Sequence, residues 1–287
     1  MLFPLILGFL LGCSGSKREI VVGTKDYTEQ YILGNILSML IESNTDISVS
    51  LKTDLSSEVI FSAIRTEVVD VYVDYTGTIY GMHLVNSETK SSDEIYSITK
   101  TALSENFDLL MLDPLGFNNS YCLAVSRDFA DSHGLMAISD LAEISENFVI
   151  GGGFEFLIRK DGLPNLKILY NMNFRSESIL DGIDRYIAIE NDEIQVMGAF
   201  STDGHLLWHD MVVLDDDKNF FYPYQGAIII SSKAAEEFPE LIDLFSQLTG
   251  LLTDMEMRNL NYRVDVHNET PQDVAELFLI QNNLINR

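Results

Sequence analysis

Strand and helix patterns alternate along residues 19–75 of this chain of 287 residues. Runs of β-branched and apolar residues suit strands, and between them apolar residues recur at helical spacing. A strand–helix–strand–helix–strand order predicts a parallel sheet with helices against its faces, and hence an α/β fold. The expected strands are 19–22, 47–52 and 70–75, and the expected helices are 28–44 and 56–65.

A second series of strand and helix patterns begins near residue 122, and a late strand and a helical C-terminus follow residue 222. It includes expected strands at 148–151 and 194–200 and an expected helix at 179–190. Two such sets, with a return to the first, predict two lobes that close about a ligand cleft. The predicted lobes comprise residues 19–121 plus 224–287, and residues 122–223.

Acidic residues far outnumber basic ones: 44 Asp and Glu face 18 Lys and Arg, for a net charge of −26. A protein that binds nucleic acid needs a positively charged surface for the phosphates. The composition therefore excludes a nucleic-acid partner. A negative surface mildly favours cationic ligands without identifying one.

The first twelve residues carry no charged side chain and suit the apolar core of a signal peptide. They end in Leu10-Leu11-Gly12-Cys13, which resembles the bacterial lipobox. We expect residues 1–12 to be a signal peptide and Cys13 to be lipidated, so that the protein is exported and anchored to the membrane. The alternative is an uncleaved hydrophobic N-terminus.

Motifs of the common catalytic and metal centres are missing from the sequence, including HExxH, CxxC, the Walker loop and GxSxG. His205 and His209 are four residues apart and could share a helix face, but no third metal ligand lies at a useful spacing. We therefore expect neither an enzyme nor a metal or other cofactor.

Four aromatic residues lie at the ends of expected elements, each close to Gly, Asn or Pro: Tyr75, Tyr121, Phe200 and Tyr224. Ring faces suit a quaternary ammonium group, which donates no hydrogen bond, and a well-placed ring contributes roughly 0.5–2 kcal/mol. The alternative is that these rings, like Tyr27, Tyr31, Tyr72 and Tyr80, serve only in packing.

Two cations, Lys25 and Arg159, occur in expected loops or helix starts. Both suit a carboxylate, and the guanidinium of arginine can bind one through two hydrogen bonds. Each has a simpler alternative: Lys25 as a surface lysine, and Arg159 as a partner of Asp161 or Glu155 only.

Several motifs in their joint order resemble one known family, the substrate-binding proteins of ABC transporters for glycine betaine, carnitine and choline. The motifs are residues 22–30, 74–78, 118–121, 156–162, 199–204, 216–224 and 261–266. The resemblance implies a type II periplasmic-binding-protein fold with the ligand between two lobes, and an ABC permease as partner.

The resemblance also implies roles for single residues. Tyr75, Tyr121, Phe200 and Tyr224 match the aromatic cage around the trimethylammonium, and Phe200 departs from the usual Tyr. Lys25, Thr78 and Arg159 match positions that hold the ligand carboxylate, and the backbone carbonyl of Asn119 faces the ammonium.

Two cations in the predicted site favour a ligand with a carboxylate, so we expect glycine betaine or a related betaine. Choline, carnitine and ergothioneine stay open as alternatives. A receptor that senses such a ligand, without feeding a transporter, also stays open.

Overall fold

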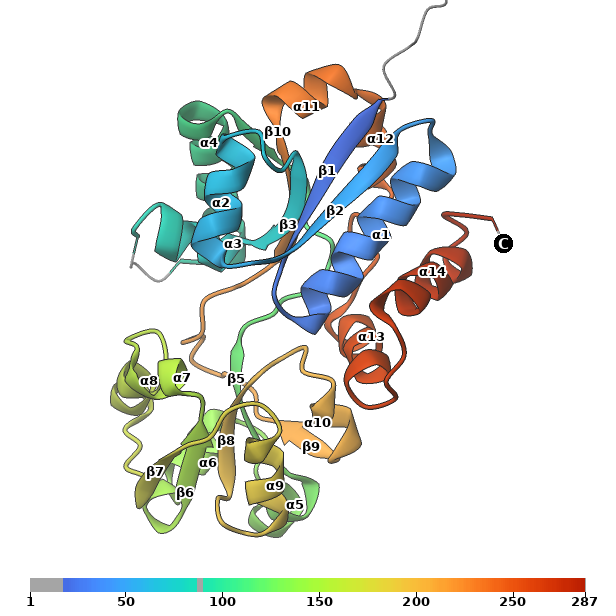
Figure 1. The fold of residues 1–287 in the computed structure, drawn as a ribbon. Helices are drawn as coiled ribbons and strands as arrows, with labels where there is room; N and C mark the ends of the chain where they lie inside the picture. Colours follow the sequence, from blue (N-terminus) through green and yellow to red (C-terminus); the bar gives the residue numbers. More distant parts are fainter. Residues whose placement is uncertain (1–17, 87–89, 287) are drawn as a thin grey trace, which may run out of the picture.

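The computed structural model describes residues 18–86 and 90–286, which form two α/β lobes one above the other (Figure 1). Lobe 1 is built around a sheet of strand order β2-β1-β3-β10-β4, and lobe 2 around a sheet of order β7-β6-β8-β5-β9. The predicted signal peptide and Cys13 lie outside the described residues.

The first sheet confirms the parallel order predicted for residues 19–75, because β1 pairs in parallel with both β2 and β3. Strand β10 comes from much later in the chain and runs antiparallel between β3 and β4. The strands are β1 (Glu19–Lys25), β2 (Ser48–Leu55), β3 (Val71–Tyr75), β4 (Leu109–Met111) and β10 (Gly226–Ser231).

Helices cover both faces of the first sheet. They are α1 (Thr28–Asn44), α2 (Ser57–Arg65), α3 (Thr76–Thr78), the π-helical turn η1 (Ile79–His83), α4 (Ser92–Phe107), α11 (Ser232–Glu237), α12 (Glu240–Ser246), α13 (Asp254–Asp265) and α14 (Pro271–Gln281). Several begin at a side-chain cap, as where Ser56 Oγ accepts a hydrogen bond from the backbone N–H of Val59. Strand β3 ends at Tyr75, and the single helical turn α3, which contains Gly77, follows it directly.

The second sheet is mixed: β6 pairs in parallel with β7 and β8, and β5 pairs antiparallel with β8 and β9. Its elements are β5 (Tyr121–Ser126), α5 (Arg127–His133), α6 (Ile138–Ala142), the 3-10 turn η2 (Ser145–Asn147), β6 (Val149–Gly152), α7 (Phe154–Ile158), α8 (Leu163–Tyr170), β7 (Ser176–Ile179), α9 (Asp184–Glu190), β8 (Val196–Phe200), α10 (His205–Trp208) and β9 (Met211–Val213).

The helix predicted over 179–190 is wrong in its first part. Ile179 ends strand β7, and helix α9 starts only at Asp184. Strand β7 lies at the edge of the sheet, and its residues are exposed or only partly buried. An edge strand of this kind carries little of the apolar pattern that identifies buried strands.

Each sheet has an apolar core on both faces. In lobe 1 the side chains of β3 alternate, so that Val73 and Tyr75 join the core under α1 whereas Tyr72 joins the core under α2. In lobe 2, Leu123 of β5 and its neighbour Cys122 face opposite cores in the same way. Burial raises the pKa of the Cys122 thiol to about 12.

Two crossover segments join the lobes, one between β4 and β5 and the other between β9 and β10 (Figure 1). They run side by side: Asn118 pairs with Gln225 in an isolated antiparallel bridge, and the N–H of Asn119 donates to the carbonyl of Tyr224 at 3.0 Å. The paired segments therefore place Asn119 and Tyr224 together, close to the start of β5 at Tyr121.

Helix α13 of lobe 1 also contacts lobe 2, next to α10 (Figure 1). Arg258 Nε donates to the carbonyl of Ser201 at 3.0 Å, and Asn261 Nδ2 donates to the carbonyl of Thr202 at 2.8 Å. At Gly204 a Cβ atom would lie 2.4 Å from the backbone nitrogen of Tyr262, so only glycine allows this approach.

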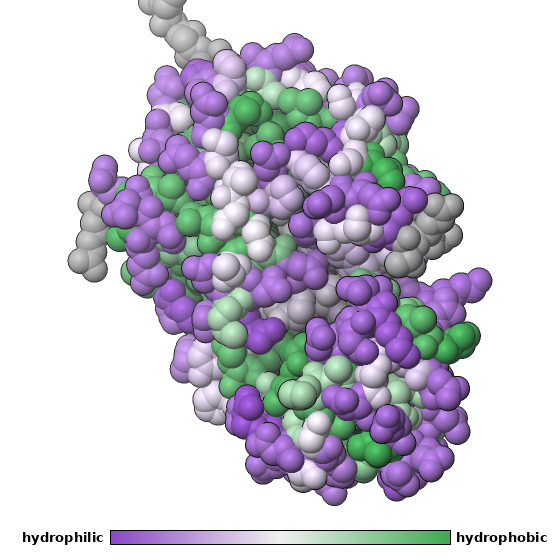
Figure 2. Space-filling view, turned by 180° about the vertical axis from the view of Figure 1, so that it is seen from behind, coloured by the Kyte–Doolittle hydropathy of each residue, from purple (hydrophilic) through white to green (hydrophobic). Residues whose placement is uncertain are grey.

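Hydrophilic side chains dominate the rear face of both lobes (Figure 2), as the net charge of −26 leads us to expect. Among the described residues, no helix combines the length and the apolar character that crossing a bilayer requires.

Candidate functional site

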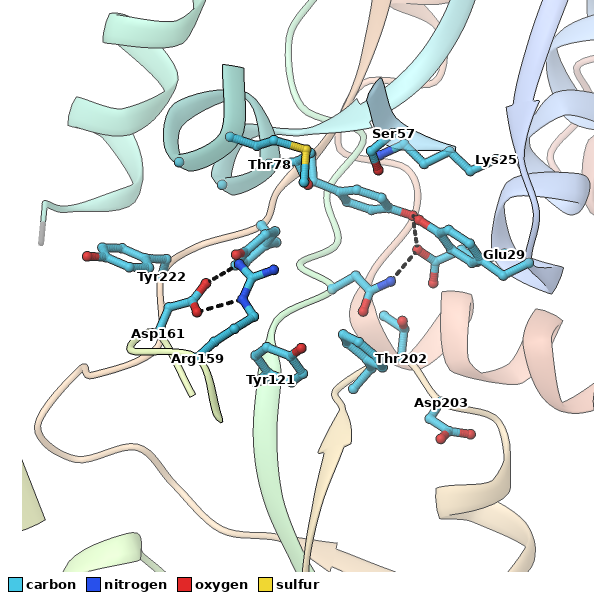
Figure 3. Close-up of a pocket in the computed structure, with 18 of the residues that line it drawn as sticks. Lys25, Glu29, Ser57, Thr78, Tyr121, Arg159, Asp161, Thr202, Asp203 and Tyr222 are labelled. Carbon is cyan, nitrogen blue, oxygen red and sulfur yellow. Dashed lines mark hydrogen bonds and ion pairs between the residues drawn. The ribbon is translucent and has the colours of Figure 1, made fainter. Parts of the chain in front are cut away.

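A cavity of about 1150 Å³ lies between the lobes (Figure 3). Its walls come from β1, α1, α2, β3, α3, η1 and α13 of lobe 1, from β5, the turn after α7, α8, β8 and α10 of lobe 2, and from both crossovers. The structure brings all eight predicted site residues to this one cavity: Lys25, Tyr75, Thr78, Asn119, Tyr121, Arg159, Phe200 and Tyr224.

Strand β3 and the turn after it shape the lobe 1 side of the cavity. Tyr75 ends the strand, and Thr78 follows in α3. At Gly77 a Cβ atom would lie 2.8 Å from the ring of Tyr224 and 2.9 Å from the carbonyl oxygen of Pro223. The glycine therefore lets the second crossover approach β3 and bring Tyr224 to the cavity.

A buried carboxylate, Glu29 in the first turn of α1, joins parts of the chain that are far apart in sequence. Its Oε1 accepts hydrogen bonds from the hydroxyl of Tyr75 at 2.6 Å and from Asn119 Nδ2 at 2.9 Å, and its Oε2 accepts one from Asn261 Nδ2 at 3.1 Å. Burial raises the pKa of Glu29, while hydrogen bonds from these residues and from Thr202 oppose the increase.

Lys25 is buried and already has a charged partner. Its Nζ lies 2.6 Å from Asp74 Oδ1, and the side chains of Lys25 and Asp74 are 4% and 0% exposed. The hydroxyl of Tyr72 donates to the other oxygen of Asp74 at 2.8 Å. Lys25 is therefore not a surface lysine, and Asp74 already balances its charge. Its role as a ligand of the substrate carboxylate stays a prediction.

Arg159 follows α7 on the opposite side of the cavity from Glu29 (Figure 3). Its Nε donates to Asp161 Oδ1 at 2.9 Å, and its Nη2 donates to Asp161 Oδ2 at 2.6 Å. This pair raises the pKa of Arg159. The third nitrogen of Arg159, Nη1, lies 3.8 Å from Glu155 Oε2, and the Arg159 side chain is 41% exposed. Nη1 can therefore still bind an incoming anion.

Two of the predicted cage rings stack on each other. The ring centroids of Tyr121 and Phe200 lie 4.9 Å apart with an angle of 21° between the planes, and Tyr121 also packs on Phe156 at 5.2 Å. A separation of 4.9 Å leaves no room for a trimethylammonium group between the rings. In this form of the protein a cation can use only their remaining surfaces.

Several residues that line the cavity were not predicted from the sequence. Glu29 and Asn261 lie in motifs of the resemblance but were given no role, and Tyr27 and Tyr80 were assigned to packing alone. A carboxylate in the first turn of a helix is common, because it interacts favourably with the helix dipole, and so it does not by itself indicate a site. The position of Glu29 directly after a strand of a parallel sheet was the signal that could have identified it.

His205 and His209 lie close together, with 5.9 Å between their ring centroids. Within residues 18–86 and 90–286, no three His, Cys, Asp or Glu side chains lie together at metal-binding distance. His209 Nδ1 lies 2.8 Å from Glu190, and the His209 ring stacks on Tyr186.

Residues 18–281 match the family described as the substrate-binding domain of the ABC-type glycine betaine transport system. The chain belongs to this family. It is a family of extracytoplasmic binding proteins in transport and not a class of enzymes.

Similar sequences span most of the chain. The ergothioneine transport permease/ergothioneine binding protein EgtU of Helicobacter pylori is 36% identical over 92% of this chain. The match covers 47% of that protein, so the chain spans about half of its length. The carnitine transport binding protein OpuCC of Listeria monocytogenes is 30% identical over 96% of this chain and 92% of its own length.

Solved structures agree with the fold. The crystal structure of a glycine betaine/carnitine/choline ABC transporter protein has a TM-score of 0.88 at 28% identity and covers 94% of this chain and 100% of its own. Apo YehZ from Escherichia coli has a TM-score of 0.80 at 24% identity and covers 93% and 99%. The predicted type II periplasmic-binding-protein fold is therefore confirmed.

Proposed function

We propose that this protein is the lipid-anchored, extracytoplasmic subunit of an ABC importer and captures a small zwitterionic quaternary ammonium compound. Glycine betaine or a related betaine binds in the cavity between the lobes. The observation that carries this proposal is the meeting, in one cavity, of four aromatic residues far apart in sequence with Arg159.

The polar groups of the cavity support a ligand with two charged ends. Arg159 lies on one side and Glu29 on the other (Figure 3). The carboxylate of a betaine binds at Nη1 of Arg159, and Thr78 adds a hydroxyl. The trimethylammonium group lies against the rings, with Tyr75 and Tyr224 completing the surfaces that Tyr121 and Phe200 leave accessible.

Movement of the lobes about the paired crossovers connects binding to transport. The lobes, residues 19–121 plus 224–287 and residues 122–223, rotate as units and bring Tyr75 and Arg159 onto one ligand. The second sheet starts at Tyr121, one residue before that boundary. An ABC permease recognises the closed form, and lipid on Cys13 keeps the protein at the membrane.

Relatives with named ligands support the compound class. The names of two relatives specify ergothioneine and carnitine, and a third, from Pseudomonas aeruginosa, is a glycine-betaine-binding protein that is 29% identical over 98% of this chain. All three ligands carry both a trimethylammonium group and a carboxylate.

Isothermal titration calorimetry with a panel of ligands tests the proposal. Glycine betaine, carnitine, ergothioneine and choline are titrated into the purified protein, with proline as a zwitterion that has no quaternary ammonium. We expect one or more of the three betaines to bind more tightly than both choline and proline. Failure of all four quaternary ammonium compounds to bind would contradict the proposal.

A sensory role is the second candidate function. A chemotactic signal transduction substrate-binding protein, CosB of Halobacterium salinarum, is 27% identical over 85% of this chain. Uptake of a radiolabelled ligand separates the two roles: deletion of the gene abolishes uptake if the protein serves a transporter and abolishes only the movement response if it serves a sensor.

A further inference from the structure

Two amide side chains next to Glu29 have carbonyl oxygens that accept no hydrogen bond from the described residues. Asn119 Oδ1 and Asn261 Oδ1 are buried and have no hydrogen-bond partner in the part of the chain that the structure describes. Both residues line the cavity, and Asn261 is only 4% exposed. Buried acceptors without a donor are rare in native proteins because they destabilise the fold.

Glu29 determines which way both amides face. Asn119 Nδ2 donates to Glu29 Oε1 and Asn261 Nδ2 donates to Glu29 Oε2, and the second amide also donates to the carbonyl of Thr202. Rotating either amide by 180° would set its carbonyl against a carboxylate oxygen, acceptor against acceptor. The amino groups must therefore face Glu29, and the carbonyls face away from it.

Glu29 itself has little capacity left for a ligand. Its Oε1 also accepts the hydroxyl of Tyr75, and that hydroxyl accepts a hydrogen bond from Gln30 Nε2 at 3.1 Å. Among the groups that contact Glu29, the two amide carbonyls can still accept a hydrogen bond, and the carboxylate that holds them is already bound by donors.

We propose that Asn119 Oδ1 and Asn261 Oδ1 form an acceptor subsite for N–H or O–H groups of the ligand, with Glu29 as their positioning residue. The ligand is then a betaine with a donor-bearing extension beyond its trimethylammonium and carboxylate groups. This inference rests on the proposed function. A cavity of about 1150 Å³ has the size of a site for a ligand much larger than glycine betaine.

The known betaines differ in the donors that they bring to this subsite. Glycine betaine has neither an N–H nor an O–H group, carnitine has one hydroxyl, and the ring of ergothioneine has N–H groups. A site with unpaired buried acceptors discriminates against a ligand that lacks the matching donor. Affinity should therefore increase from glycine betaine through carnitine to ergothioneine.

Calorimetry on single variants tests the subsite. Asn119→Ala and Asn261→Ala are each titrated with ergothioneine and with glycine betaine, and the ratio of the two dissociation constants is compared with that of the unmodified protein. We expect ergothioneine to lose about 3- to 10-fold in affinity and glycine betaine to be nearly unaffected. Asn35→Ala is the matched control, because Asn35 donates to the carbonyl of Tyr31 within α1.

The ratio separates a binding role from a structural one. A variant that only disturbs the fold weakens the binding of both ligands alike, and this outcome would overturn the inference. The inference would also be overturned if glycine betaine bound the unmodified protein at least as tightly as ergothioneine does. If neither ligand binds the unmodified protein, and carnitine and choline do not bind either, the proposed function itself is wrong. Glycine betaine binding alone would refute the subsite and leave the proposed function intact.

Discussion

The two walls of the cavity differ in how deeply their site residues are buried. On the lobe 1 wall, Lys25 and Glu29 are buried, and each is held by hydrogen bonds or an ion pair. On the lobe 2 wall, Arg159 and Phe200 are each more than 40% exposed. The difference teaches that lobe 1 provides a rigid surface whereas lobe 2 provides groups that can still adjust to a ligand.

Replacing Lys25 tests the rigid wall most severely. Lys25→Met leaves Asp74 buried without its cation, and breaking a buried pair in this way costs about 3–5 kcal/mol of unfolding free energy. Urea unfolding followed by circular dichroism measures the loss. Lys233→Met is the control, because Lys233 and its partner Glu67 are exposed and their pair contributes little. Equal stability of the two variants would show that the wall is not rigid.

Replacing Glu29 tests the same wall through pH. In the unmodified protein the Glu29 carboxylate is surrounded by hydrogen-bond donors, and Glu29→Gln puts a further donor, an amide, among them. We therefore expect the free energy of unfolding to fall by about 1–3 kcal/mol at neutral pH. Burial raises the pKa of Glu29, so the folded state holds this proton more tightly than the unfolded state does. The contribution of Glu29 is therefore most favourable at acidic pH and falls as pH rises through the raised pKa.

Urea unfolding at several pH values between 4 and 8 isolates this contribution as the difference between the unmodified protein and Glu29→Gln. The advantage of the unmodified protein should shrink as pH rises. A difference that stays constant or grows with pH would contradict the raised pKa.

Replacing Arg159 tests the adjustable wall through ligand selectivity. Arg159→Ala removes the proposed partner of the ligand carboxylate, so glycine betaine should lose about tenfold in affinity, which corresponds to about 1.4 kcal/mol. Choline has no carboxylate and should lose much less. Calorimetry with both ligands measures the difference between the two losses. Lys167→Ala is the control, because it removes a positive charge of the same lobe that lies outside the cavity lining. An equal loss for both ligands would refute the assignment.

Replacing Phe200 should have the smallest effect. Phe200→Ala removes one ring face and should weaken any quaternary ammonium ligand by roughly 0.5–2 kcal/mol. Phe200→Tyr restores the residue usual in the resemblance, keeps the ring face and should stay within a fewfold of the unmodified protein. Calorimetry on both variants measures these affinities. If Phe200→Ala bound the ligand with unchanged affinity, Phe200 would have no role in the cage.

Local patterns were enough to predict most of the fold. β-branched runs and helical spacing located β1, β3, α1 and α2 to within a few residues, because these elements bury one face or both and carry a strong apolar period. Edge strand β7 was missed, because a strand with few buried residues has no such period.

The sequence by itself determined the α/β class, because strand and helix periods are local properties, and the resemblance of its motifs to a known family implied the eight residues that meet at the cavity. Only the tertiary structure decided how those residues are paired. The partners Lys25 and Asp74 are 49 residues apart, and Glu29 and Asn261 are 232 residues apart. Which charge stays available to a ligand depends on such distant neighbours, because burial and hydrogen bonding set the cost of each charge.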